Sequence, residues 1–265
     1  MVKEFKGKNF WAIILGGSSG LGLASAKKLA AHGLNICIIH RNSRSQMKSI
    51  IRDFDQLQQM DVEFLSFNVD AIKKENIIEV IQSLKILMGN HGKIRVLLHS
   101  IAKGNLKSMI DEDEPTLQND DFNITINAMA ISLFDWTIAL YNEKLFAEDA
   151  RVLSFTSEGN SNAWKNYAAV SAAKAALEAI TRNIALEFAG YGIRANCIQA
   201  GVTDTASLNM IPGNDIIKNH SLKRNPFSRL TTPEDVANAV YLLCKDEASW
   251  INGSIIPVDG GEHIC

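Results

Sequence analysis

One tyrosine and one lysine lie together in an alanine-rich stretch of the chain. Tyr167 and Lys174 stand seven positions apart within NYAAVSAAKAALEA, residues 166–179. On a helix, seven residues advance the chain by about 10.5 Å and return it close to the same face. A nearby cation favours the phenolate, so we expect Lys174 to lower the pKa of Tyr167. The pair is a first candidate for acid–base or oxyanion chemistry.

A glycine-rich loop, LGGSSGLG at residues 15–22, is the second chemical signal. It follows an apolar run and precedes a helical pattern. Glycine there allows a tight turn and the close approach of backbone to a pyrophosphate at the helix N-terminus. A plain strand-to-helix turn is the alternative, but the first such junction of the chain favours a dinucleotide site. The expected cofactor contacts are Gly16, Ser18, Ser19, Gly20, Leu21 and Gly22.

The adenosine end of the cofactor is expected after the second and third strands. NAD sites usually place an acid after the second strand to hold the ribose 2′-hydroxyl. This chain reads IIHRNSR there, with Arg41, Asn42 and Arg44 and no acid. Guanidinium pairs strongly with phosphate, so NADPH is favoured over NADH, although a solvated loop would also carry arginines. Asn68 and Val69, after the third strand, are expected to touch adenine.

Short apolar runs alternate with helical patterns along the whole chain. Such runs suit strands that are covered on both faces, and repeated strand–helix–strand units with right-handed crossovers build one parallel sheet. We therefore expect an α/β fold with a single doubly wound, Rossmann-like parallel sheet flanked by helices, as one domain over residues 1–265. The predicted strands are Trp11–Leu15, Asn35–Ile39, Val62–Phe67, Ile94–His99, Arg151–Phe155, Arg194–Gln199 and Ser254–Val258. The predicted helices include Leu21–His32, Asn76–Met88, Ile124–Leu140, Tyr167–Gly190 and Pro233–Lys245.

Composition narrows the class of partner. The net charge is −2, which gives no reason to expect nucleic acid or an anionic membrane as a partner. The four cysteines are scattered along the chain, and we expect them to be buried free thiols in a reducing cytoplasm. No secretory signal and no run of about 18 apolar residues is seen, and no cluster has the spacing of a metal site. Residues 206–228 are expected to form a substrate-binding loop or lid, with an ordinary surface connection as the alternative.

Several motifs, in chain order, resemble those of the short-chain dehydrogenases/reductases along almost the whole chain. They are the glycine loop, Asn127 in TINAMA, Ser157 after the fifth strand, the Tyr167–Lys174 pair, AGVTDT at residues 200–205 and the terminal VDGG. That family usually has Tyr-x3-Lys, whereas this chain has Tyr-x6-Lys. The longer spacing, with HSIA at residues 99–102, resembles the enoyl-acyl-carrier-protein reductases, and most closely the NADPH-dependent type of bacilli.

The resemblance implies a role for each motif residue. Lys174 would bind the hydroxyls of the nicotinamide ribose, and Tyr167 would act on the substrate. Asn127 would kink its helix and hold a water near the lysine, with a purely structural role as an equal alternative. Ser157 stands where ketoreductases carry their catalytic serine. The further cofactor contacts would be Ser100, Ile101, Ala102, Lys174, Gly201, Thr203 and Thr205.

The implied activity is NADPH-dependent reduction of a trans-2-enoyl thioester in fatty-acid synthesis, on acyl carrier protein or coenzyme A. Hydride would reach C3, and charge would develop on the thioester oxygen, two carbons further away than in ketone reduction. A phenol set one turn further from Lys174 is placed to stabilise that enolate. Val170 occupies the ordinary tyrosine position. Trp164 and Met210 are candidates for the acyl site, with a place in the apolar core as the alternative.

Two other functions stay open at this point. Ser157 and Tyr167 together could serve a carbonyl reductase that acts on a 3-oxoacyl thioester or a specialised metabolite. A nucleotide-sensing protein without turnover would keep the same fold. His99 is expected to be a packed, hydrogen-bonded residue rather than a base. The resemblance also implies a homo-oligomer, a tetramer, paired through the alanine-rich helix.

Overall fold

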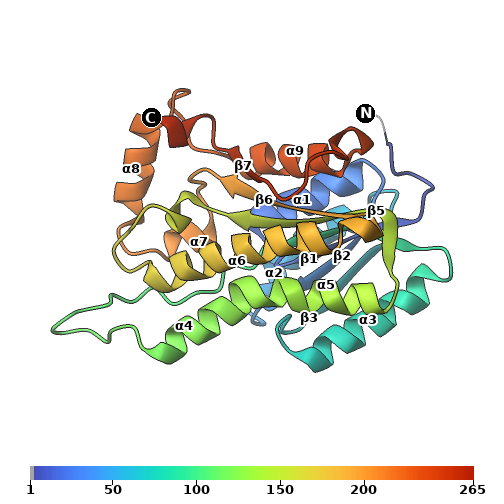
Figure 1. Ribbon diagram of the computed structural model, residues 1–265, viewed down its shortest axis with the longest axis horizontal. Helices are drawn as coiled ribbons and strands as arrows, with labels where there is room; N and C mark the ends of the chain where they lie inside the picture. Colours follow the sequence, from blue (N-terminus) through green and yellow to red (C-terminus); the bar gives the residue numbers. More distant parts are fainter. Residues whose placement is uncertain (1–2) are drawn as a thin grey trace.

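A seven-stranded parallel sheet organises the computed structural model, which describes residues 3–265 (Figure 1). The strand order is β3-β2-β1-β4-β5-β6-β7, and every neighbouring pair is parallel. The strands are β1 Phe10–Leu15, β2 Asn35–His40, β3 Phe64–Asn68, β4 Lys93–His99, β5 Phe146–Thr156, β6 Ile193–Ala200 and β7 Ile255–Val258. All seven predicted strands are confirmed, although β5 starts five residues earlier than expected.

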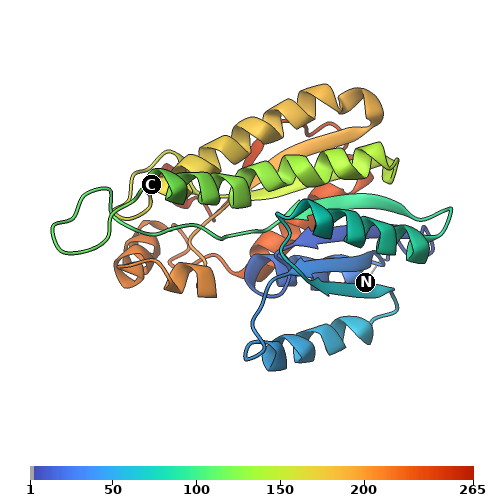
Figure 2. The same cartoon turned by 90° about the horizontal axis from the view of Figure 1, so that it is seen from below.

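Helices cover both faces of this sheet and make three layers (Figures 1 and 2). One face carries α1 Gly20–Ala31, α2 Met47–Gln58 and α9 Pro233–Cys244. The other carries α3 Lys74–Met88, α5 Ser132–Asn142 and α6 Ala168–Glu187. The remaining helices are α4 Asn119–Ile126, α7 Ala206–Asn209 and α8 Asn214–Arg224, with short turns η1 Asn127–Ile131, η2 Glu158–Asn160, η3 Ala189–Tyr191, η4 Asp246–Ala248 and η5 Glu262–Ile264. The doubly wound fold is therefore confirmed.

The strands are apolar at nearly every position because helices cover both faces of the sheet. Trp11, Ile13 and Leu15 of β1 point into the core under α3, α5 and α6. Ala12 and Ile14, between them, point into the core under α1, α2 and α9. Because each successive side chain changes face, a strand that is buried on both faces must be apolar at every position.

The longest helical segment runs from Asn119 to Asn142 and changes geometry in its middle. It begins at Asn119, five residues before the predicted start, where the side chains of Gln118 and Asp121 form a capping box. A π-helical turn occupies η1 Asn127–Ile131. The segment is long and apolar enough to cross a membrane, but half of its most apolar window is buried inside the molecule. It is a core helix that packs against α6.

The structure adds detail to the sequence prediction in three places. Helix α2 was not predicted, although Ile50, Phe54 and Leu57 have helical spacing and are buried. Most of residues 206–228, the expected loop or lid, is helical, in α7 and α8. Helix α6 begins at Ala168, so Tyr167 is its N-cap with non-helical backbone angles. The direction of the Tyr167 side chain is therefore set by the preceding turn and not by the helix.

The order in which strands are added to the sheet reverses between β1 and β4. The strands β2 and β3 follow on one side of β1, whereas β4 pairs with β1 on the other side. In open α/β sheets, ligands bind outside the carboxyl ends of the strands at this switch point. The glycine loop follows β1 there. Gly16 has φ +83°, and a Cβ atom on it would lie 2.5 Å from the carbonyl oxygen of Ser100, which follows β4.

Replacing Gly16 by alanine should therefore cost about 1–3 kcal/mol in the free energy of unfolding. The left-handed φ and the contact with Ser100 both oppose a side chain at this position. Gly190→Ala is the control, since no atom lies within 4 Å of a Cβ built there. Denaturant unfolding of both variants measures the difference, and equal stabilities would contradict this account of the loop.

Candidate active site

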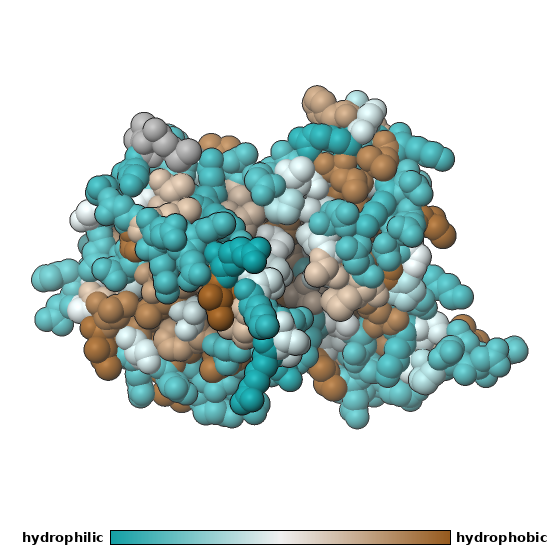
Figure 3. All heavy atoms as spheres, turned by 180° about the vertical axis from the view of Figure 1, so that it is seen from behind, coloured by the Kyte–Doolittle hydropathy of each residue, from teal (hydrophilic) through white to brown (hydrophobic). Residues whose placement is uncertain are grey.

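A cavity of about 630 Å³ opens at the carboxyl ends of the central strands. It is lined by segments that follow β1, β4, β5 and β6, together with α6, α7 and α8. Figure 3 shows a hollow between two parts of the surface on this side of the molecule. The cavity thus occupies the switch point of the sheet, where the sequence places the cofactor.

Most of the predicted site residues line this cavity. Those that do so are Gly16, Ser18, Ser19, Gly20, Leu21, Arg41, Val69, Ser100, Ile101, Ala102, Ser157, Tyr167, Lys174, Gly201, Thr203 and Thr205. Segments that are far apart in the sequence therefore meet in one place. Five predicted residues are not part of the lining: Gly22, Asn42, Arg44, Asn68 and Asn127.

Three of those five have other contacts. A Cβ on Gly22 would lie 2.5 Å from the Gly16 carbonyl oxygen, so this glycine allows α1 to pack against the loop. The Asn68 side chain accepts a hydrogen bond from the Asn42 N–H at 2.9 Å and donates one to the Asn42 carbonyl at 3.1 Å. This pair ties the ends of β2 and β3 together. Arg44 is exposed.

An acid missed by the sequence reasoning lies at the adenosine end. Asp70 follows β3 and forms an ion pair with Arg41, with 2.6 Å between Oδ2 and Nη1, and both residues line the cavity. Asp70 was not predicted, because an acid was expected only after β2. The end of β3 is a second position from which an acid can reach this part of the site, because β2 and β3 are neighbours that end together at His40 and Asn68. The site thus holds a cation and an acid side by side.

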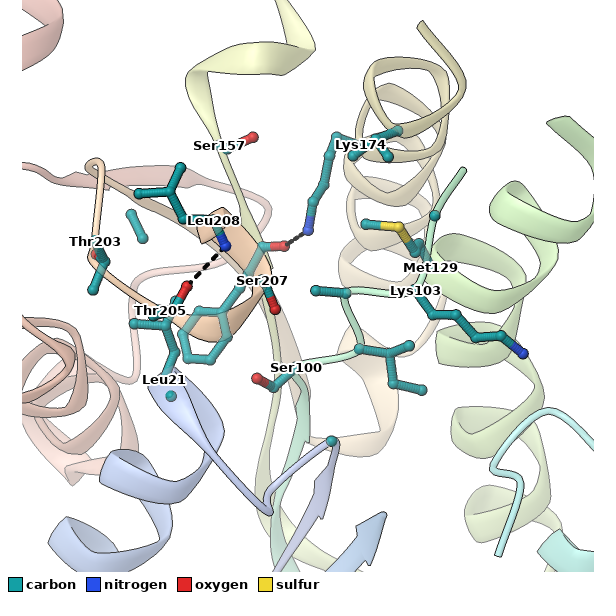
Figure 4. Close-up of a pocket in the computed structure, with 18 of the residues that line it drawn as sticks. Leu21, Ser100, Lys103, Met129, Ser157, Lys174, Thr203, Thr205, Ser207 and Leu208 are labelled. Atoms are coloured by element: carbon teal, nitrogen blue, oxygen red, sulfur yellow. Dashed lines mark hydrogen bonds between the residues drawn. The ribbon is translucent and has the colours of Figure 1, made fainter. Parts of the chain in front are cut away.

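Lys174 is buried, and its Nζ donates a hydrogen bond of 2.5 Å to the Phe155 carbonyl oxygen (Figure 4). The bond joins α6 to the end of β5. Desolvation lowers the pKa of Lys174 to about 8, and the nearby Cys197 and Glu178 side chains partly oppose this fall. The lysine therefore holds its position through the backbone of the sheet.

Tyr167 stands at the start of α6, with its hydroxyl 3.5 Å from the Ser157 hydroxyl. Its ring lies against η2, since a Cβ on Gly159 would approach its Cε1 atom to 2.5 Å. Burial raises the pKa of Tyr167, and the Ser157 hydrogen bond only partly opposes the rise. The expected lowering by Lys174 is therefore wrong for this structure: desolvation dominates, and the phenol form is favoured.

Asn127, where a kink is expected, marks a change of helix geometry. This residue begins the π-helical turn η1 and lies outside the cavity lining, but Ala128 and Met129 of the same turn line the cavity. Such turns inside an α-helix are frequent at functional sites. The π-helical turn thus contributes Ala128 and Met129 to the wall of the cavity.

His99 is packed, as expected. Its Nε2 lies 2.8 Å from the Ser132 hydroxyl, which itself donates to the Ala128 carbonyl. Burial, followed by repulsion from Lys174, lowers the pKa of His99 to about 3. The imidazole is therefore neutral near pH 7 and connects the end of β4 to the π-helical turn.

The segment 206–228 forms one wall of the cavity. Ile211, Ile217 and His220 line it, and the His220 ring packs edge-on against Trp164, with ring centroids 6.1 Å apart. Met210 also lines the cavity and is 64% exposed, so its alternative place in the core is wrong. The sequence reasoning did not single out Glu158 and Arg224. Arg224 of α8 pairs with Glu158 at 2.8 Å, beside Ser157, and donates to the Glu262 carbonyl.

The sequence matches a known protein family over almost its whole length. The model of the family described as enoyl-(acyl carrier protein) reductase matches residues 16–263. The chain belongs to this family, a branch of the short-chain dehydrogenases/reductases. It is an oxidoreductase with the nicotinamide-dinucleotide-binding fold of that group.

Individual relatives carry two different activities in their names. The chain is 33% identical to the enoyl-acyl-carrier-protein reductase (NADH) FabI of Aquifex aeolicus over 186 residues, which covers 68% of this chain and 66% of that protein. It is 28% identical to the 3-oxoacyl-acyl-carrier-protein reductase FabG of Chlamydia muridarum over 253 residues, 94% and 96% of the two chains. The Bacillus cereus enoyl-acyl carrier protein reductase, solved with NADP+ and indole naphthyridinone, has a TM-score of 0.85 at 26% identity, covering 100% of this chain and 99% of that one.

Proposed function

We propose that this oxidoreductase is an NADPH-dependent enoyl-thioester reductase of fatty-acid synthesis. The observation that carries the proposal is the place of Tyr167. Its phenol reaches the cavity from the N-cap of α6, while Val170, at the ordinary tyrosine spacing from Lys174, lines the cavity with an apolar side chain. The family match and the Aquifex relative support the same substrate class.

The residues present fit a dinucleotide. Gly16 and Gly20 both adopt left-handed φ angles where backbone must approach a phosphate closely. The cavity continues from this loop to Ser100, Thr203 and Lys174. When bound, the reduced nicotinamide supplies a hydride. Lys174 would hold the ribose hydroxyls beside it.

Tyr167 would act as a hydrogen-bond donor to the thioester oxygen. As hydride reaches C3, electrons move from the C2–C3 double bond toward that oxygen and form an enolate, which then takes a proton at C2. A donor must keep its own proton near neutral pH, and burial of Tyr167 raises its pKa. A preorganised donor at the atom where charge develops stabilises the transition state in a water-poor cavity.

Apolar residues in the lining of the cavity favour a substrate with an acyl chain. Trp164, Met210, Ile211 and Ile217 supply apolar lining in the same cavity as Tyr167. We propose an acyl thioester, carried by acyl carrier protein or coenzyme A, as the substrate and the cytoplasm as the compartment. The names of both relatives include acyl carrier protein, which supports this choice of carrier.

A carbonyl reductase is the second candidate, because one contact favours it. The Ser157 hydroxyl lies 3.5 Å from the Tyr167 hydroxyl, so two donors could meet at a ketone oxygen. The Chlamydia relative, a 3-oxoacyl reductase by name, aligns over nearly the full chain. In that reaction the substrate would be a 3-oxoacyl thioester.

The oligomer is also proposed to follow the family. Apolar side chains stand exposed along the outer sides of α4, α5 and α6, among them Ile124, Phe134 and Leu186. Exposed apolar surface of this kind marks a contact between proteins. A homotetramer would cover it.

Turnover of two thioesters separates the two enzyme functions. We expect NADPH consumption with a crotonyl thioester and none with an acetoacetyl thioester, at equal enzyme and substrate concentrations. Tyr167→Phe should lower kcat on the crotonyl compound by about 100-fold or more, because the oxyanion donor is lost. Tyr191→Phe, at an exposed tyrosine outside the cavity, should leave it unchanged. Turnover of the acetoacetyl compound alone would contradict the proposal and favour the carbonyl reductase.

The Arg41–Asp70 pair generates a prediction on the cofactor. A 2′-phosphate would compete with Asp70 for the Arg41 guanidinium and would be repelled by that carboxylate. Asp70→Asn should therefore tighten NADPH binding relative to NADH by about tenfold, and Arg41→Ala should weaken NADPH binding selectively. Asp61→Asn, at an exposed acid that pairs with Lys6, is the control. Fluorescence titration of both cofactors measures the ratio, and equal effects on NADH and NADPH would contradict the assignment.

A further inference from the structure

A buried acid lies one helical turn beyond Lys174. Glu178 of α6 is 7% exposed and accepts two hydrogen bonds at the same oxygen, Oε1. One comes from the Thr156 hydroxyl at 2.5 Å, and the other from the Asn160 side-chain amide at 2.5 Å. Burial of a carboxylate is costly unless it is hydrogen-bonded, so both contacts are needed to keep Glu178 inside.

The two donors stand on either side of Ser157. Thr156 is the last residue of β5, and Asn160 ends the short turn η2 that follows Ser157. The Asn160 Oδ1 atom is buried without a hydrogen-bond partner among residues 3–265, so the orientation of this amide rests on its bond to Glu178. The same turn contains Gly159, against which the Tyr167 ring lies. Glu178 therefore fixes both ends of the segment that positions Ser157 and Tyr167.

Helix α6 is thus joined to the end of β5 at two successive turns. Lys174 donates to the Phe155 carbonyl, as Figure 4 shows, and Glu178 accepts from Thr156. A shift of α6 along the sheet would break both bonds together. The position of the lysine amine relative to the Ser157 turn is set by this pair of contacts.

Glu178 also balances the charge of Lys174. The titratable groups that face this lysine come from three elements: His99 of β4, Cys197 of β6 and Glu178 itself. Burial lowers the pKa of His99 to about 3 and raises the pKa of the Cys197 thiol, so both favour their neutral forms near pH 7. The Glu178 carboxylate is the remaining acid that can offset the buried ammonium.

We propose that Glu178 is a positioning residue of this active site, which holds the Ser157 turn in place and supplies negative charge one helical turn from the Lys174 ammonium. The proposal rests on the proposed function only in taking Lys174 as a residue that must be charged to bind cofactor. Its two parts, hydrogen bonding and charge, can be separated by substitution.

Glu178→Gln keeps an acceptor oxygen and removes the charge. Lys174 would then titrate at lower pH, because an opposite charge that favours the ammonium is gone. We expect the alkaline limb of the pH profile of kcat, and of the NADPH dissociation constant measured by fluorescence, to move down by about one pH unit. Glu178→Asp should keep the limb where it is in the native protein and lower kcat, because the shorter side chain cannot satisfy both donors.

Glu187→Gln, at an exposed acid on the last residue of the same helix, is the matched control and should change neither quantity. Thermal unfolding of every variant separates misfolding from a local effect. If Glu178→Gln binds NADPH with an unmoved alkaline limb, the charge role is overturned. Should the native protein reduce neither thioester, the proposed function fails, while the binding profile still decides the role of Glu178.

Discussion

The Lys174 ammonium group lies in the interior of the molecule, and the geometry of the site depends on how it is held there. Removing a charge from water is costly and must be offset by hydrogen bonds and opposite charge. The Phe155 carbonyl supplies the first, and Glu178 contributes the second. The Lys174–Phe155 and Glu178–Thr156 hydrogen bonds tie α6 to the end of β5, so the lysine that would hold the cofactor also helps to fix the helix that begins after Tyr167.

The same burial sets the protonation of the neighbouring groups. Desolvation raises the pKa of Tyr167 and lowers the pKa of His99 to about 3, so the phenol keeps its proton and the imidazole stays neutral. Donors of this kind are suited to a developing oxyanion and not to proton abstraction. This protonation fits the proposed reduction of an acyl thioester, in which residues of α7 and α8 would line the acyl side of the cavity.

Motifs of local sequence were sufficient to predict the sheet, the glycine loop and the residues around Tyr167 and Lys174. Each depends on short-range constraints: apolar runs, a glycine at a left-handed φ and a fixed spacing. Asp70 was missed because its partner Arg41 is 29 residues away and only the pairing of β2 with β3 brings them together. Glu178 was missed for a similar reason, since an acid on an alanine-rich helix gives no sign that Thr156 and Asn160 will bury it.

Direct titration of Lys174 tests the central claim. Lysine labelled with 13C at Cε can be followed by NMR as a function of pH, and the Lys174 signal is the one that disappears in Lys174→Arg. Burial predicts a midpoint near pH 8, well below the ordinary value of 10.5. A midpoint at 10 or above would mean that burial does not destabilise the ammonium, and would contradict the account of how α6, β5 and the Tyr167–Lys174 pair depend on one another.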